Sequence, residues 1–145
     1  MTLCKVVGFH NKILGLTHYL VAPLLLLARL YIANIFFKSG LTKIRDWEST
    51  LMLFEYEYEV PLIPFELAAW AGTAGELILP VLLVLGLFTR VSAIGLFFVN
   101  AVAVISLSEI SPAAMNEHIL WGSVIFMLII LGAEKLSLDR KFQVT

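Results

Sequence analysis

The sequence has 145 residues, of which 60% are hydrophobic and 14% are charged. Soluble domains usually carry about 25% charged residues, so this composition predicts an integral membrane protein that forms one bundle without a second domain. A net charge of −1 excludes the basic footprint of a nucleic-acid-binding protein. The single cysteine, Cys4, excludes an intramolecular disulfide, and the few histidines show no zinc-binding spacing, so we expect no metal site.

The N-terminal segment, residues 1–18, precedes the first long apolar run. Its apolar residues can share one helix face, which predicts either an interfacial cytoplasmic helix or a frayed tail. The first span is predicted at residues 19–37, YLVAPLLLLARLYIANIFF, with one charge at Arg29. Two lysines precede this run as in a signal peptide, but its length, its arginine and the lack of an A-x-A cleavage site favour a retained span.

Three further apolar runs are long enough to cross a bilayer, although the last is the shortest. They predict spans at residues 66–88, 91–107 and 119–136. The long connection is expected at residues 38–65, and residues 137–145 are expected to form a cytoplasmic tail. Residues 19–136 therefore predict an all-α fold, a polytopic membrane four-helix bundle.

Charges outside the spans predict the orientation of this bundle. Six Lys and Arg residues would lie on the side of the two termini, against three on the opposite side. The positive-inside rule then favours an N-in/C-in arrangement, with both termini in the cytoplasm.

Three polar residues lie near the centres of three predicted spans. Arg29, Glu76 and Asn100 are each ten residues from one end of an apolar run, or roughly 15 Å at 1.5 Å per residue. An isolated ion at this depth is costly, so we expect a midplane cluster in which Arg29 pairs with Glu76 and Asn100 hydrogen-bonds to one of them. Such a pair either binds a ligand or only fixes the helix register.

The first helix also carries a face that leads away from this cluster. Its members are spaced by seven, four and three residues: Arg29, Phe36, Gly40 and Lys43. This spacing places them on one side of a continuous helix.

A second polar cluster is predicted at the rim opposite the termini. Glu117, His118 and Trp121 open the fourth span, and Lys43 follows the first. A histidine beside a carboxylate suits proton exchange near neutral pH, whereas interface anchoring is favoured for Trp121. The alternating glutamates of the run FEYEYEVP, residues 54–61, favour an acidic solvated loop over a strand.

Two long stretches carry a resemblance to a known family. They are LLLARLYIANIFFKSGLTKI, with Arg29 and Lys43, and AGTAGELILPVLLVLGLFTRVSAIGL, with Glu76 and Arg90. Together with the later runs HILW and SLDRKF, they make the chain resemble bacterial members of the DoxX family over about residues 20–142. The resemblance implies a multi-pass protein of the bacterial inner membrane, in a family named for its relation to a membrane subunit of a thiosulfate:quinone oxidoreductase. It leaves the chemistry open.

The leading hypothesis is a quinone-linked redox subunit or accessory component without a covalently bound cofactor. Arg29, with Glu76 as counter-ion, would hold the quinone headgroup, and Glu117 or His118 would exchange protons. The alternative is a non-enzymatic scaffold, assembly or export partner, whose acidic loop contacts another membrane or periplasmic protein. A homo-oligomer is compatible with both hypotheses, and a transporter is a third possibility. Whether the chain is an enzyme stays open.

Overall fold

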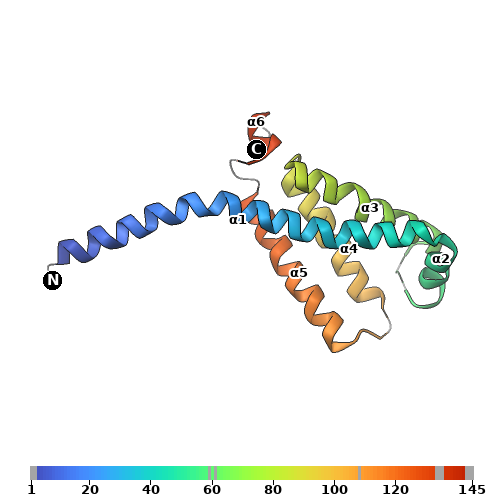
Figure 1. Ribbon diagram of the computed structural model, residues 1–145. Helices are drawn as coiled ribbons and strands as arrows, with labels where there is room; N and C mark the ends of the chain where they lie inside the picture. The colour runs from blue at the N-terminus through green and yellow to red at the C-terminus, as the bar shows by residue number, and fades with distance from the viewer. Residues whose placement is uncertain (1–2, 59, 61, 108, 133–135, 143–145) are drawn as a thin grey trace.

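The computed structural model in Figure 1 is a helical bundle from which one long helix projects. It describes residues 3–58, 60, 62–107, 109–132 and 136–142, with side chains from residue 19 onward. The helices of the described part are α1 (Leu3–Arg45), α2 (Trp47–Tyr56), α3 (Phe65–Leu85), α4 (Thr89–Ser106), α5 (Pro112–Leu131) and α6 (Leu138–Lys141). Helices α3, α4, α5 and the Tyr19–Arg45 part of α1 are long and apolar enough to cross a membrane. The predicted all-α, four-span membrane fold is thus confirmed.

Helix α1 runs without a break for 43 residues. Residues 3–18 are helical and project away from the other helices (Figure 1). The first span was expected to end near Lys38, but the helix continues to Arg45. Lys38 is an exposed, good helix former, and the buried face continues past it through Phe36 and Gly40, so nothing stops the helix there.

Helix α2 lies within the predicted long connection at residues 38–65, and the first residues of that connection belong to α1, which ends at Arg45. Asp46 caps its first turn by accepting hydrogen bonds from Ser49 N, at 3.1 Å, and Ser49 Oγ, at 2.6 Å. The helix turns away from the end of α1 and lies against α3 (Figure 1), where the rings of Trp47 and Trp70 are 4.2 Å apart. After α2, Tyr58 forms an isolated bridge to Leu107, so the FEYEYEVP run is neither a loop throughout nor a full strand.

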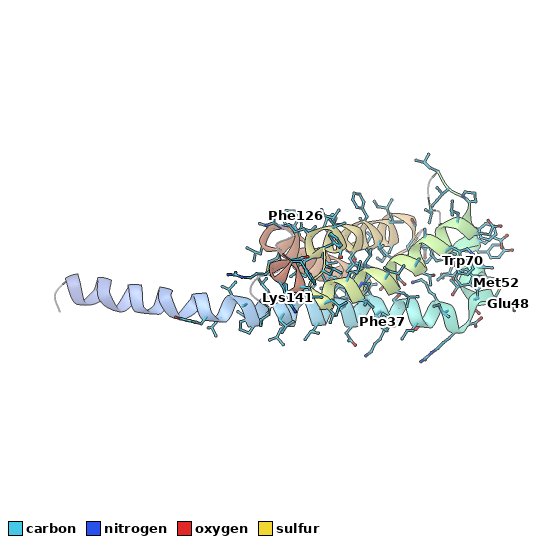
Figure 2. The ribbon with its side chains drawn as sticks, turned by 90° about the horizontal axis from the view of Figure 1, so that it is seen from above. Phe37, Glu48, Met52, Trp70, Phe126 and Lys141 are labelled. Atoms are coloured by element: carbon cyan, nitrogen blue, oxygen red, sulfur yellow. The ribbon has the colours of Figure 1, made fainter. Side chains whose placement is uncertain are left out.

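Helix α3 runs antiparallel to α1 and packs between α1 and α4, and α5 covers α4 and α1. The buried core they share is apolar: Leu25, Ile32, Phe36, Leu83, Ala93, Leu96, Ile125 and Leu128. In Figure 2, Phe37 and Phe126 point outward from the bundle, and both side chains are exposed. An outer surface that carries large exposed apolar side chains suits a lipid environment.

The fourth membrane helix, α5, is displaced from the predicted range of 119–136. It begins at Pro112 because Ser111 caps it, its Oγ accepting a hydrogen bond from Ala114 N at 3.2 Å, and because proline suits the first helical position. It ends at Leu131, where Gly132 takes a φ of 71°.

The C-terminal segment packs against the turn between α3 and α4. That turn contains Gly86, with a φ of 64°, and Phe88, with a φ of 49°. The Asp139 carboxylate accepts hydrogen bonds from Phe88 N, at 2.6 Å, and Thr89 N, at 2.8 Å, while Asp139 N donates to Gly86 O at 2.8 Å. Residues 137–142, which belong to the predicted cytoplasmic tail, therefore pack against the bundle. We call this region the Gly86 end, and the opposite region the α2 end.

Candidate functional site

The cation that neutralises Glu76 is Lys43, not Arg29. Lys43 Nζ lies 2.6 Å from Glu76 Oε2, and the two side chains are 14% and 10% exposed. Gly40 makes the close approach of α1 and α3 possible, because a Cβ there would lie 3.1 Å from Glu76 Cβ and 2.9 Å from Leu77 Cγ. Glu76 follows Phe65 by eleven residues, so this pair lies roughly 16 Å along α3.

Lys43 retains one hydrogen-bond donor after its contacts within the protein. An ammonium group has three N–H donors. One goes to Glu76 Oε2, and a second goes to Ser39 Oγ at 3.0 Å. The third has no partner among the residues that the structure describes, and it is available to a ligand.

Arg29 lies at the Gly86 end, so the predicted Arg29–Glu76 pair is wrong. Its guanidinium Nη2 donates to the Leu136 carbonyl, and Asp139 supplies a nearby opposite charge. The side chain is 1% exposed, and its Nε and Nη1 have no partner within the described part of the chain. Because α1 continues past Lys38, Gly40 rather than Arg29 lies at the level of Glu76. Gly40 is eleven residues after Arg29.

Asn100, the third member of the predicted midplane cluster, binds His118 instead. Asn100 Nδ2 donates to the His118 carbonyl at 3.0 Å, and Asn100 Oδ1 lies 2.8 Å from His118 Nδ1. Trp121 approaches the His118 ring edge-on, with centroids 4.9 Å apart, and packs against Phe36 at 6.2 Å. Trp121 therefore packs partly against the bundle core.

The predicted outer cluster is divided between two places. Lys43 joins Glu76 on α3, whereas His118 and Trp121 join Asn100 between α4 and α5. Glu117 is exposed and forms no hydrogen bond within the described residues. Each contact thus joins residues of the two predicted clusters. Lys43 of the outer cluster pairs with Glu76 of the midplane cluster, and His118 of the outer cluster binds Asn100 of the midplane cluster.

A cavity of about 330 Å³, here called the α2 cavity, opens beside the Lys43–Glu76 pair. Its polar lining includes Lys43, Glu76 and Tyr58, and its apolar lining includes Phe54, Val99 and Val102. A cavity of this size, mostly apolar with a few polar groups, is typical of a small-molecule site.

Tyr58 is the member of this site that the sequence did not indicate. Burial raises the pKa of its hydroxyl, and the charges of Glu76 and Glu57 raise it further. The hydroxyl is therefore protonated near neutral pH and has no hydrogen-bond partner in the described part of the chain. The sequence shows only alternating Tyr and Glu, which does not distinguish the inward Tyr58 from the exposed Tyr56.

Comparisons with known proteins agree with this architecture. The DoxX family model matches residues 24–109, a range that contains Lys43, Tyr58 and Glu76. An uncharacterized protein of Haemophilus influenzae is 33% identical over 124 residues, covering 79% of this chain and 80% of that protein. No solved structure matches the chain significantly. The family match and the four apolar helices together establish that this chain is a multi-pass membrane protein of the DoxX family.

Proposed function

We propose that this DoxX-family protein is a quinone-binding accessory component of a membrane redox system, and that the quinone headgroup occupies the α2 cavity. The observation that carries this proposal is the pair of unused donors in an apolar cavity. One is the third N–H of Lys43, and the other is the hydroxyl of Tyr58. Both donors match quinone carbonyl oxygens, which only accept hydrogen bonds.

The charge balance of the cavity favours a neutral ligand. Lys43 and Glu76 neutralise each other at 2.6 Å, so an added anion or cation would be left without a counter-charge. The remaining lining is mostly aliphatic and aromatic, including Phe54 and Phe98. Such walls suit a ring with an apolar tail that arrives through the lipid phase.

The chain's own residues would bind and orient this ligand. A quinone supplies two-electron, two-proton redox chemistry when it is bound, and the electrons would pass to or from a partner protein of the membrane or periplasm. Lys43 would polarise one carbonyl by donating to it, and Glu76 would hold the ammonium in place through its ion pair.

The proposal also includes the membrane in which the protein lies and its orientation there. A bacterial relative and the positive-inside count support the bacterial inner membrane, with both termini in the cytoplasm. The Gly86 end would then face the cytoplasm, and the α2 end would face the periplasm.

The proposal is tested by the quinone content of protein purified in mild detergent, measured by absorbance and mass spectrometry. Tyr58→Phe removes one donor without removing a charge, and we expect it to lower the bound quinone several-fold. Tyr56→Phe is the matched control, because Tyr56 is 75% exposed and lies two residues earlier. Absence of quinone from the wild-type protein, even after incubation with an excess, would overturn the proposal.

A non-enzymatic scaffold is the second candidate, and the exposed surface of α2 favours it. This surface combines Glu48, Glu55 and Glu57 with the exposed Met52 and Tyr56. Charge reversal by Glu48→Lys with Glu55→Lys would then abolish copurification of a partner protein while quinone content stays unchanged.

A further inference from the structure

A second cavity, of about 460 Å³, lies between α4 and α5 and shares no lining residue with the α2 cavity. Phe97, Val104 and Phe126 are among its apolar walls, and His118, Asn100 and Ser123 are its polar members. The Ser123 hydroxyl donates to the Ile119 carbonyl of its own helix at 2.8 Å. His118 and the second N–H of the Asn100 amide are then the groups left to address a ligand.

Asn100 fixes which nitrogen of His118 carries the hydrogen. The His118 carbonyl can only accept, so the group that contacts it at 3.0 Å must be the Asn100 amide nitrogen. The amide oxygen therefore faces His118 Nδ1 at 2.8 Å, and Nδ1 must be the donor. In the neutral imidazole, Nε2 then has a lone pair and no hydrogen.

The lone pair of Nε2 is not used within the described part of the chain. His118 makes its side-chain hydrogen bond through Nδ1, and Nε2 has no partner among the described residues. An acceptor on a residue that lines a mostly apolar cavity favours a ligand that donates a hydrogen bond. A ligand with acceptors alone would leave two lone pairs facing each other, which is a costly arrangement away from water.

We propose that the α4–α5 cavity binds the reduced form of the ligand, a quinol, through a hydroxyl that donates to His118 Nε2. This inference rests on the proposed function and extends it, because an acceptor for the reduced ligand would complement the donors that the α2 cavity offers to the oxidised ligand. The α2 cavity offers donors from Lys43 and Tyr58 and suits the oxidised quinone. The α4–α5 cavity offers an acceptor and suits the quinol, while its aromatic walls, with Phe97 and Phe126 at 6.4 Å, contact the ring.

The test uses three probes with the full-length protein in mild detergent under anaerobic conditions. They are decylubiquinol, decylubiquinone and the dimethyl ether of decylubiquinol, which has the shape of the quinol but no donor. We expect the quinol alone to shift the nitrogen-15 resonance of His118 Nε2. His118→Leu is expected to weaken quinol binding roughly three- to tenfold and to leave quinone binding unchanged. Asn116→Ala, an exposed polar residue earlier on α5, is the control and should bind all probes as the wild type does.

The outcomes separate this inference from the proposed function. A shift of the His118 resonance by the dimethyl ether or by the quinone equal to that by the quinol would overturn the inference. So would quinol binding that is unaffected by His118→Leu. If the quinol shifts His118 Nε2 but Tyr58→Phe does not change quinone binding, the α4–α5 site stands and the assignment of the α2 cavity fails. The resonance shift is read in the wild-type protein, so the test does not depend on the folding of a variant.

Discussion

Lys43 and Glu76 join two helices through a 2.6 Å ion pair between residues separated by 33 positions in the sequence. The pair ties the last turns of α1 to the middle of α3 and forms one wall of the α2 cavity. It therefore couples the stability of the bundle to the geometry of the candidate site.

We expect removal of either charge alone to destabilise the bundle. Lys43→Met leaves Glu76 without its cation, and Glu76→Gln leaves Lys43 without its anion, and breaking one side of a buried pair typically costs about 3–5 kcal/mol. The double variant has no orphaned charge, so it should be more stable than either single variant. Thermal unfolding in detergent measures the stability of the wild type, the two single variants and the double variant. Lys38→Met serves as the exposed control. A double variant whose loss equals the sum of the two single losses would contradict a direct pairing.

The sequence was sufficient for the fold class because long apolar runs have few alternatives in lipid. It was not sufficient for the register of the first span. Lys38 marked a boundary in the hydropathy pattern, but an exposed lysine does not end a helix, and α1 continues to Arg45. This one displacement moved Arg29 to the Gly86 end and brought Lys43 to Glu76.

For a related reason, the sequence did not predict which side chains on different helices contact each other. Glu76 and Asn100 were correctly chosen as residues that need polar partners, since both are buried. Depth alone does not say which helix faces they share, so the choice of Arg29 was wrong. The role of Asp139 was hidden because a carboxylate in a polar C-terminal run looks like a solvated tail, although it is 7% exposed.

Asp139→Ala should loosen the Gly86 end. The Asp139 carboxylate accepts hydrogen bonds from Phe88 N and Thr89 N, two donors at the start of α4 that have no other partner among the described residues. Loss of buried hydrogen bonds to a charged group is expected to cost about 1.5–3 kcal/mol. Hydrogen–deuterium exchange of the first turn of α4 should rise, and Lys141→Ala, at an exposed site nearby, should leave it unchanged. Equal exchange in both variants would show that the C-terminal segment does not hold this turn.

Gly40 and Gly72 make a matched pair for the contact between helices. A Cβ at Gly40 would lie 2.9 Å from Leu77 Cγ and 3.1 Å from Glu76 Cβ, whereas at Gly72 the nearest atom would be Phe54 Cζ at an ordinary 3.5 Å. Gly40→Ala should therefore separate α1 from α3 and cost about 1–3 kcal/mol. Gly72→Ala should be neutral or stabilising, because it also removes glycine from a helix interior. Thermal unfolding compares the stabilities of the two variants. A Gly72→Ala variant that is less stable than Gly40→Ala would refute the close approach of α1 and α3 at Gly40.

Acid should release the first turn of α2. Hydrogen bonds from the Ser49 side chain and backbone hold the pKa of Asp46 below its ordinary value of 3.8. A carboxylate with a lowered pKa in the folded state stabilises that state above its ordinary pKa, and this contribution is lost as the pH falls below 3.8 and through the folded value. Exchange of α2 amides should therefore rise in acid more steeply in the wild type than in the Asp46→Asn variant, which keeps a capping side chain but does not titrate. The same acid response in this variant and in the wild type would assign the effect to another group.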